Sequence, residues 1–332
     1  MNIEYTAIKL VKRPELNITP DLFEVVKMTT SEIEDGQILI KQTHMSLDPA
    51  MKGWMTPDRE SYIPPVELGD VMRSSGVGEV VESKNEKFPV GSRVAGMMGW
   101  TEYAVSNGQG LNQLPPEIPT EAVMCVLALP GLTAYQGLMN VGKPKAGETI
   151  LISGAAGSVG SMVGQIAKAE GLTVIGTAGT EEKCRWLTEE LGFDAAINYK
   201  SANLADELKA AAPKGLDLYF ENTGGAVQNH VFDLMNAHGR IMVCGMISDY
   251  NAEVPAAGPN WIPIIKKRLL IQGFTMPDHY DKVPEMMQAM AKYLMEGKIK
   301  YRAHVLEGLE SAIDGINLLF DGGNTGKLMV KL

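Results

Sequence analysis

Short apolar strands alternate with helical segments through the second half of the chain, and this alternation limits the fold more than any other feature. Such alternation is typical of a parallel sheet with helices on both faces. We therefore expect an α/β domain of the doubly wound, Rossmann type. The expected strands are 149–153, 173–178, 195–198, 217–221, 240–244 and 268–274, and the expected helices are 158–170, 181–191, 203–212, 226–237 and 284–296.

The first strand of this series, which begins at Thr149, leads into a glycine-rich turn and then a helix. Gly154, Gly157 and Gly160 follow a G-x-x-G-x-x-G spacing. Glycine lets backbone N–H groups approach a ligand closely, and a helix N-terminus favours an anion, so a pyrophosphate is the natural ligand. The spacing differs from the commoner G-x-G-x-x-G. The alternative is a turn that only lets the helix pack on the strand.

The first third of the chain has a different pattern, in which short strands are separated by glycine and proline. This pattern is typical of an antiparallel, barrel-like module. We expect strands here at 38–42, 76–82, 92–96 and 101–105, and we expect 301–305 and 327–332 to return to this module. The predicted domains are therefore 1–124 with 301–332, and an inserted dinucleotide-binding domain at 125–300.

Composition favours a globular enzyme in a reducing compartment. The chain has 332 residues, a net charge of −10 and only three cysteines, so we expect a cytoplasmic protein without nucleic-acid partners. We expect no membrane partner either, because no apolar stretch approaches the ~20 residues of a membrane span. The longest stretch, Ala122 to Leu129, stops at Pro130-Gly131, where we also expect the helical segment 121–141 to break.

Ligands for a catalytic zinc are missing from the sequence pattern. The five histidines form no i, i+4 pair, and none stands near two cysteines. Since a catalytic zinc takes such ligands, we expect no metal. Without a Lewis acid, hydride transfer is easiest to an acceptor that is already electrophilic, such as the β-carbon of an α,β-unsaturated ketone or aldehyde.

The end of the second strand of the series favours NADP over NAD. NAD-binding domains carry an acidic residue there for the ribose, whereas the 2′-phosphate of NADP needs a cation. This strand ends at Ala178-Gly179 without an acid, and Lys183 follows in the first turn of a helix with Thr180 as its N-cap. A lysine there opposes the helix dipole unless an anion is near. The alternative is a solvated Lys183 whose charge two preceding glutamates offset.

Six segments carry a family resemblance: Ser46–Gly53, Leu129–Tyr135, Ala155–Gly160, Gly192–Asp194, Tyr219–Gly225 and Val243–Asn251. They resemble the zinc-free medium-chain dehydrogenase/reductase superfamily, and within it the leukotriene B4 dehydrogenase, prostaglandin reductase and NADPH-dependent curcumin reductase group, most of all its bacterial curcumin reductases. The resemblance implies a Rossmann-type domain inserted in a GroES-like, mainly antiparallel β-barrel catalytic domain. It also implies a homodimer that uses NADPH to reduce the C=C bond of small apolar enones and enals, including curcumin-type substrates.

The same resemblance assigns the residues of the NADPH site. They are Gly157, Ser158, Val159 and Gly160 at the pyrophosphate, Lys183 and Tyr199 at the 2′-phosphate, and Asn222, Cys244, Gly245, Met246, Ile247, Ser248, Tyr250, Phe274, Thr275, Met276 and Asn324 as further contacts. Asn222 and Cys244 follow strands at the expected carboxyl edge of the sheet, where ligands bind. The alternatives are that Tyr199 caps the sheet edge, that Asn222 and Asn324 form turns, and that Cys244 contributes only its backbone.

Tyr250 is the candidate enolate partner or proton source, since a neutral phenol can donate at pH 7. The alternatives are that it holds the nicotinamide ribose, whose 2′-hydroxyl would then be the donor, or that it only packs. Met51, Tyr62 and Met124 are candidates for an apolar substrate pocket, with ordinary core as the alternative. Relatives commonly have tyrosine where this chain has Ala50, and losing that ring should widen the substrate site.

Two other functions stay open at the level of sequence. A quinone reductase of the same superfamily would share both NADPH and the missing zinc. A non-catalytic NADPH-binding sensor would keep the nucleotide turn without the chemistry. The Val243–Asn251 segment with its Tyr250 favours the enone reductase over the quinone reductase, and the intact glycines together with Lys183 argue against a decayed site.

Overall fold

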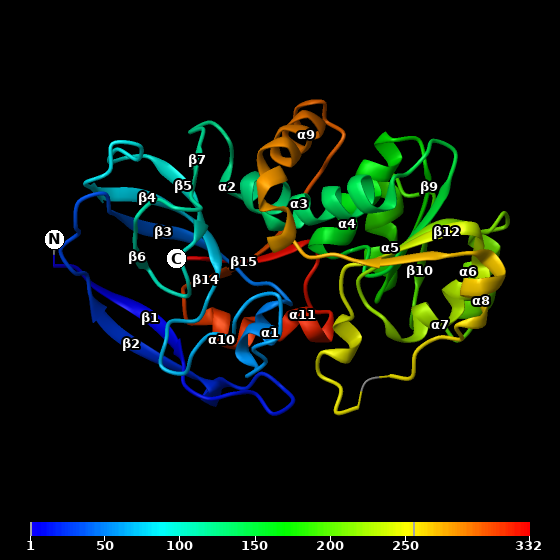
Figure 1. Ribbon diagram of the computed structural model, residues 1–332, viewed down its shortest axis with the longest axis horizontal. Helices are drawn as coiled ribbons and strands as arrows, with labels where there is room; N and C mark the ends of the chain where they lie inside the picture. The colour runs from blue at the N-terminus through cyan, green and yellow to red at the C-terminus, as the bar shows by residue number, and fades with distance from the viewer. Residues whose placement is uncertain (1, 255) are drawn as a thin grey trace. The chain divides into compact units, whose positions relative to one another are not determined.

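The computed structural model describes residues 2–254 and 256–332, which divide into two compact units (Figure 1). The first unit consists of Met1–Met124, Ala303–Asn324 and Leu328–Leu332. The second consists of Cys125–Arg302 and Thr325–Lys327. The second unit is thus an insertion in the first, and a short piece of the C-terminal segment belongs to it as well.

The second unit is built on a six-stranded sheet with the order β10-β9-β8-β11-β12-β13, and its pairings are parallel. In chain order this is 3-2-1-4-5-6, the doubly wound arrangement whose switch point lies between β8 and β11. The predicted Rossmann-type domain is therefore confirmed. The strands are β8 (Thr149–Ile152), β9 (Thr173–Ala178), β10 (Ala195–Asn198), β11 (Leu216–Glu221), β12 (Met235–Val243) and β13 (Leu270–Gly273).

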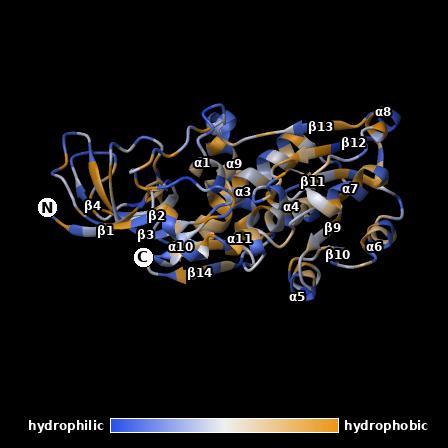
Figure 2. Cartoon of the chain, turned by 90° about the horizontal axis from the view of Figure 1, so that it is seen from below, coloured by the Kyte–Doolittle hydropathy of each residue, from blue (hydrophilic) through white to orange (hydrophobic). Residues whose placement is uncertain are grey.

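Amphipathic helices accompany this sheet. In Figure 2, β12 and β13 are mostly hydrophobic, whereas α5 and α6 carry both colours. The α-helices of the second unit are α3 (Leu129–Tyr135), α4 (Ser158–Ala169), α5 (Glu181–Arg185), α6 (Leu204–Ala211), α7 (Gly225–Leu234), α8 (Ile262–Lys267) and α9 (Val283–Met295), and the π-helical turn Trp186–Glu190 continues α5.

Small residues let α4 approach the sheet closely. A Cβ atom at Gly164 of α4 would lie 1.9 Å from the ring of Phe193, and one at Gly176 of β9 would lie 3.0 Å from the same ring. Phe193 is buried. Its ring therefore occupies the space that two glycines leave between the helix and the sheet.

The first unit holds a seven-stranded sheet with the order β14-β15-β3-β4-β5-β7, with β6 paired to β3. The pairings of β3 with β15, β4 and β6 are antiparallel, which confirms the predicted GroES-like, mainly antiparallel domain. The strands are β3 (Ile38–Ser46), β4 (Ser75–Ser83), β5 (Arg93–Met97), β6 (Tyr103–Ser106), β7 (Asn112–Leu114), β14 (Ala303–Glu307) and β15 (Lys327–Lys331). A separate hairpin consists of β1 (Glu4–Leu10) and β2 (Phe23–Thr29), and the α-helices are α1 (Met51–Met55), α2 (Thr120–Ala122), α10 (Ser311–Gly315) and α11 (Leu318–Asp321).

The helical segment Thr120–Gly142 breaks at a different residue from the expected Pro130-Gly131. It is 23 residues long, and its most apolar 18-residue window has a mean hydropathy of 1.5, so it is long and apolar enough to cross a membrane by length and composition. However, 72% of its most apolar window is buried, as in a core helix. The segment is interrupted at Ala128, whose backbone is extended, and Pro130 lies in the first turn of α3 (Leu129–Tyr135) rather than at the break. Proline suits that position because an N–H group in the first turn of a helix has no acceptor within the helix, so its absence costs no hydrogen bond.

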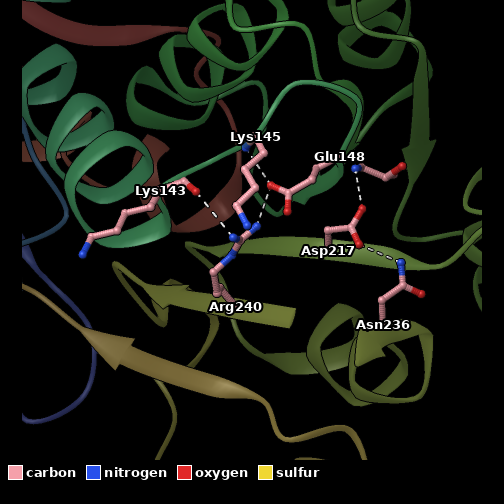
Figure 3. Close-up of polar contacts among 7 residues, drawn as sticks. Lys143, Lys145, Glu148, Asp217, Asn236 and Arg240 are labelled. Carbon is pink, nitrogen blue, oxygen red and sulfur yellow. Dashed lines mark hydrogen bonds and ion pairs between the residues drawn. The ribbon is translucent and has the colours of Figure 1, made fainter. Parts of the chain in front are cut away.

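A polar network lies at the amino ends of the central strands (Figure 3). Arg240 of β12 donates to Glu148 at 2.6 Å and to the carbonyl of Lys143 at 3.4 Å. Asp217 of β11 accepts the backbone N–H of Thr149 at 2.9 Å and the amide of Asn236 at 2.8 Å. These contacts join three neighbouring strands at the edge opposite to their carboxyl ends.

Candidate functional site

The glycine turn after β8 is a tight backbone loop. Gly154 has a φ of +58°, and its carbonyl accepts the N–H of Gly157 at 3.0 Å. A Cβ atom at Gly160 would lie 2.5 Å from that carbonyl oxygen, so only glycine fits there. The helix α4 then begins at Ser158, and no side chain caps its N-terminus. The backbone N–H groups and the positive end of the helix dipole therefore suit a pyrophosphate.

A further glycine, Gly326, which the sequence analysis did not single out, lies against this turn. The N–H of Gly326 donates to the carbonyl of Ala156 at 2.9 Å, and Gly326 forms a parallel bridge with Gly157. Gly326 has a φ of +69°, and a Cβ atom there would lie 2.1 Å from the carbonyl oxygen of Arg302. The predicted contact Asn324 is partly exposed and precedes Gly326 by two residues. The available signal was the Gly323-Asn324-Thr325-Gly326 turn composition.

The carboxyl ends of β9 and β10 meet beside Gly179. Thr180 caps α5 as predicted, since its hydroxyl accepts the N–H of Lys183 at 3.2 Å. Tyr199 donates its N–H to Ala178 at 3.0 Å, and a Cβ atom at Gly179 would lie 3.0 Å from the Tyr199 hydroxyl. Tyr199 and Lys183 are both partly solvent-accessible. A phenol and an ammonium at neighbouring strand ends, with no acid at the tip of β9, are suited to a 2′-phosphate.

Asn222 lies directly beside the glycine turn, across the switch point of the sheet. Its side-chain amide donates to the carbonyl of Ser153 at 2.8 Å, and its backbone N–H donates to the Ser153 hydroxyl at 2.8 Å. A Cβ atom at Gly154 would lie 3.5 Å from the Cβ of Asn222. The structure therefore brings together two parts of the predicted site that are far apart in the sequence.

The segment after β12 is held on the end of β11. The N–H groups of Cys244 and Gly245 donate to the carbonyl of Glu221 at 2.9 and 3.1 Å. Burial, with a smaller effect of the Glu221 carboxylate, raises the pKa of the Cys244 thiol to about 12. The thiol therefore stays protonated at neutral pH and is a poor nucleophile. A backbone contact of Cys244 with the cofactor, which was the alternative from the sequence, stays a prediction.

The same segment continues over Asn222 and ends at Tyr250. Ile247 and Ser248 donate their N–H groups to the carbonyls of Asn222 and Thr223 at 3.3 and 3.0 Å. The helical turn Ile247–Asp249 follows, and Tyr250 ends it. Four of the predicted cofactor contacts, Met246, Ile247, Ser248 and Tyr250, therefore lie in one loop that is anchored on the residues after β11.

The Tyr250 phenol is partly buried, with 38% of the residue exposed. Its oxygen accepts the N–H of Met246 at 3.4 Å, which leaves the phenol hydrogen for another acceptor. Burial raises the pKa of Tyr250 above its ordinary value, an effect that the Met246 N–H reduces and Cys244 adds to. The phenol is therefore a neutral donor over the whole neutral range.

The three predicted contacts after β13 use their side chains within the second unit. Phe274 packs edge-on against Phe220, with the ring centroids 6.1 Å apart. The hydroxyl of Thr275 donates to Asp278 at 3.1 Å. Met276 is buried in an apolar cluster with Leu132 and Met286. Their contact with the cofactor stays a prediction.

The predicted substrate-pocket residues belong to the first unit. Met51 has 0% of its surface exposed and lies in the apolar core of that unit, and Met124 is 3% exposed. Tyr62 is 54% exposed. Ala50 packs against the same core as Met51. For Met51 the structure thus favours the core alternative, and Tyr62 is the one of the three with an accessible ring.

Among the residues that the structure describes, no three His, Cys, Asp or Glu side chains gather as a metal site would require. One acidic residue near the site was missed by the sequence analysis. Glu221, at the end of β11, is completely buried. The signal was a single acid at the end of the otherwise apolar run Leu218–Phe220.

Comparisons with known proteins give relatives over nearly the whole chain. The family model described as the N-terminal domain of oxidoreductase matches residues 6–114, and the one described as zinc-binding dehydrogenase matches residues 158–292. The chain is 40% identical to the NADPH-dependent curcumin reductase of Escherichia coli (strain K12), over 97% of this chain and 95% of that protein. It is 40% identical to prostaglandin reductase 1 of Bos taurus, over 93% of each. The solved structure of CurA from Vibrio vulnificus in complex with NADPH is similar with a TM-score of 0.91 and 38% identity, and 98% of each chain is covered.

Proposed function

Since the chain belongs to the zinc-free medium-chain dehydrogenase/reductase family, in the group of prostaglandin and curcumin reductases, we propose that it reduces the C=C bond of α,β-unsaturated ketones and aldehydes. It is an NADPH-dependent oxidoreductase. The observation that carries the finer proposal is the loop that ends at Tyr250. This loop is hydrogen-bonded to Asn222, which lies beside the glycine turn, so a neutral phenol is attached to the nucleotide edge of the sheet.

The residues at the carboxyl edge of the sheet fit NADPH. The N–H groups at Gly157 to Gly160 would hold the pyrophosphate, and Lys183 with Tyr199 would hold the 2′-phosphate. Asn222 and the Cys244–Tyr250 segment would hold the nicotinamide half. NADPH supplies a hydride when it is bound. The chain itself positions the acceptor and stabilises the charge that reduction creates.

Tyr250 is the residue of this chain best suited to stabilise that charge. Reduction of an enone at its β-carbon places negative charge on the carbonyl oxygen, and a donor there lowers the barrier. Because the phenol keeps its proton at neutral pH, it can donate a hydrogen bond to this oxygen or a proton to the α-carbon. The alternative donor is the ribose 2′-hydroxyl of the cofactor, with Tyr250 holding the ribose.

The proposal is tested by following NADPH absorbance with a small set of acceptors. The set contains a medium-chain 2-alkenal, an aryl enone, curcumin, a quinone and a saturated aldehyde, and each is repeated with NADH. We expect turnover of the alkenal and the enones with NADPH and little with NADH. Turnover of the quinone alone would instead make the protein a quinone reductase. Tight NADPH binding without any turnover would favour a sensor.

We also propose that the protein is a cytoplasmic homodimer. Its three cysteines are free thiols, which suits a reducing compartment. In the described part of the second unit, β13 is the last strand of its sheet, so its outer N–H and C=O groups are available to a second copy. Nearby residues add apolar surface: Trp261, Ile265 and Leu270 are 63%, 81% and 52% exposed.

A further inference from the structure

Glu221 is a fully buried carboxylate with no assigned part in the proposed reaction. One oxygen, Oε1, accepts the Ser153 hydroxyl at 2.7 Å and the N–H groups of Thr223 and Gly224 at 2.8 Å each. The other oxygen, Oε2, accepts the Tyr219 hydroxyl at 2.6 Å. The Thr223 hydroxyl also donates to Oε1, at 3.5 Å. A buried carboxylate is costly unless donors surround it, and these donors provide the required hydrogen bonds.

The donors on Oε1 belong to two different strand ends. Ser153 follows β8, while Thr223 and Gly224 form the turn between β11 and α7. That turn needs unusual backbone angles, since Gly224 has a φ of +72° and Gly225 a φ of +62°. The carboxylate therefore joins the two sides of the switch point and fixes the turn. The Ser153 hydroxyl also accepts the N–H of Asn222, so it also holds this predicted cofactor contact in place.

Backbone hydrogen bonds at Glu221 and the next two residues connect the same turn to the segment that follows β12. The Glu221 carbonyl accepts the N–H groups of Cys244 and Gly245, and the next two carbonyls accept those of Ile247 and Ser248. The Ser248 hydroxyl also donates to the Thr223 carbonyl. The loop that carries Tyr250 is thus attached to the turn that Glu221 holds. A continuous set of hydrogen bonds runs from the Glu221 carboxylate to this loop.

We propose that Glu221 is a positioning residue for the nicotinamide half of the cofactor site: its carboxylate sets the Asn222–Gly224 turn and, through that turn, the loop of Tyr250. Glu221 acts through these neighbours, because it has no exposed surface with which to touch a ligand. This inference rests on the proposed use of NADPH. It does not depend on which acceptor the enzyme reduces.

The two oxygens of Glu221 allow a matched set of variants. Glu221→Leu removes the acceptor of all these donors, whereas Glu221→Gln can keep an oxygen at the Oε1 position for the donors that fix the turn. Tyr219→Phe removes only the hydrogen bond to Oε2. Tyr219 is equally buried and lies outside the turn, so this variant is the control for loss of a buried hydrogen bond. Ser153→Ala is a milder disruption of the turn if the leucine variant does not fold.

The measurements are the Kd for NADPH from its fluorescence, the KM and kcat with an enone, and the unfolding temperature. Leaving buried donors without acceptors costs about 1–3 kcal/mol, which corresponds to roughly 5- to 150-fold in Kd where the cost falls on the bound state. We expect Glu221→Leu or Ser153→Ala to raise the Kd for NADPH by at least about fivefold. We expect Glu221→Gln and Tyr219→Phe to stay within about twofold, although Tyr219→Phe lowers the unfolding temperature.

Several results would overturn the inference. One such result is that Glu221→Leu and Ser153→Ala bind NADPH with the same Kd as Tyr219→Phe, while the three variants have similar unfolding temperatures. Glu221 would then have a purely structural role. A Glu221→Gln variant as impaired as Glu221→Leu would show that the charge matters rather than the turn. The wild type separates this test from the proposed function. Wild-type binding of NADPH without enone turnover would contradict the substrate proposal alone, and no binding at all would contradict the use of NADPH.

Discussion

The phenol of Tyr250 has an expected pH signature. Burial raises its pKa above the ordinary value of about 10, so it is protonated, and able to donate, at every pH below that value. Its donor role is lost only as the pH rises through the raised pKa. We therefore expect kcat of the wild type to show no alkaline loss from this group up to about pH 10. A pH–rate profile with saturating NADPH and an enone measures this.

Substitution of the same residue separates the two possible proton sources. We expect Tyr250→Phe to lower kcat by about 100-fold while the Kd for NADPH changes little, because positioned acid catalysis contributes about that much. The phenylalanine keeps the ring and removes only the hydroxyl. Unchanged kcat in this variant would assign proton donation to the ribose hydroxyl. A large rise in the Kd for NADPH would instead show that Tyr250 holds the cofactor.

Lys183 has a charge that distinguishes the two nicotinamide cofactors. We expect Lys183→Ala to raise the KM for NADPH about tenfold and to leave the KM for NADH unchanged, since only NADPH carries the 2′-phosphate that its ammonium would pair with. Lys209→Ala is the control, because Lys209 is an exposed lysine on the next helix, α6. Equal effects on both cofactors would show that Lys183 does not bind the 2′-phosphate.

Among the elements, the contact between α4 and β9 depends on the absence of two side chains. We expect Gly164→Ala to destabilise the fold by about 1–3 kcal/mol, because its Cβ would overlap the buried Phe193 ring. The double variant with Phe193→Leu should recover part of this loss, since a smaller side chain leaves room. Urea unfolding of the wild type, the two single variants and the double variant gives the coupling free energy between the two positions. Additive losses would show that Phe193 is not the obstacle.

The network of Figure 3 lies at the amino ends of the strands, away from the nucleotide edge. We expect Arg240→Met to lower the free energy of unfolding by about 1–3 kcal/mol, because it removes a partly buried charged hydrogen bond to Glu148. The Kd for NADPH should not change. The control is Lys12→Met, which breaks the exposed ion pair with Asp21 and should leave the free energy of unfolding nearly unchanged. A weaker NADPH affinity in Arg240→Met would contradict the separation of the two edges.

The elements that the sequence predicted well are those that local chemistry defines. The strand over 173–178 is a run of β-branched and small residues between a glycine on each side, and the structure has it with the same bounds. The strand expected at 240–244 instead begins at Met235, because the parallel pairing with Leu216 extends it past an irregularity in the register. Pairing with a distant strand is not visible in local sequence.

The candidate site follows the same rule. The turn at Gly157 and the cap at Thr180 come from residues within a few positions of one another, so their geometry could be predicted. Glu221 and Gly326 each have a local signal in the sequence, but the contacts that give them a place in the site involve residues far away in the chain. The partner Ser153 lies 68 residues from Glu221, and Ala156 is far from Gly326 in the chain. Only the folded sheet brings these groups together.

At the scale of the whole molecule, the outer edge of β13 makes the proposed dimer testable. We expect Ile265→Glu to shift the protein toward monomer in analytical ultracentrifugation, because a charge would replace an apolar side chain that is 81% exposed on α8. Met295→Glu is the matched control, since Met295 is equally exposed but lies on α9. The same mass for Ile265→Glu as for the wild type would contradict a dimer through this edge.

The contact between Gly326 and Ala156 also has a consequence for synthesis. During translation the glycine turn after β8 emerges long before Gly326, so a nascent chain can form the central strands of the sheet while the turn still lacks this partner. Lys327 to Lys331 then complete the sheet of the first unit by pairing with β3. Neither unit is therefore complete until the same short segment has been synthesised. A ribosome paused shortly before that segment would therefore display two incomplete units, and a chaperone that recognises exposed strand edges would find its substrate at this stage.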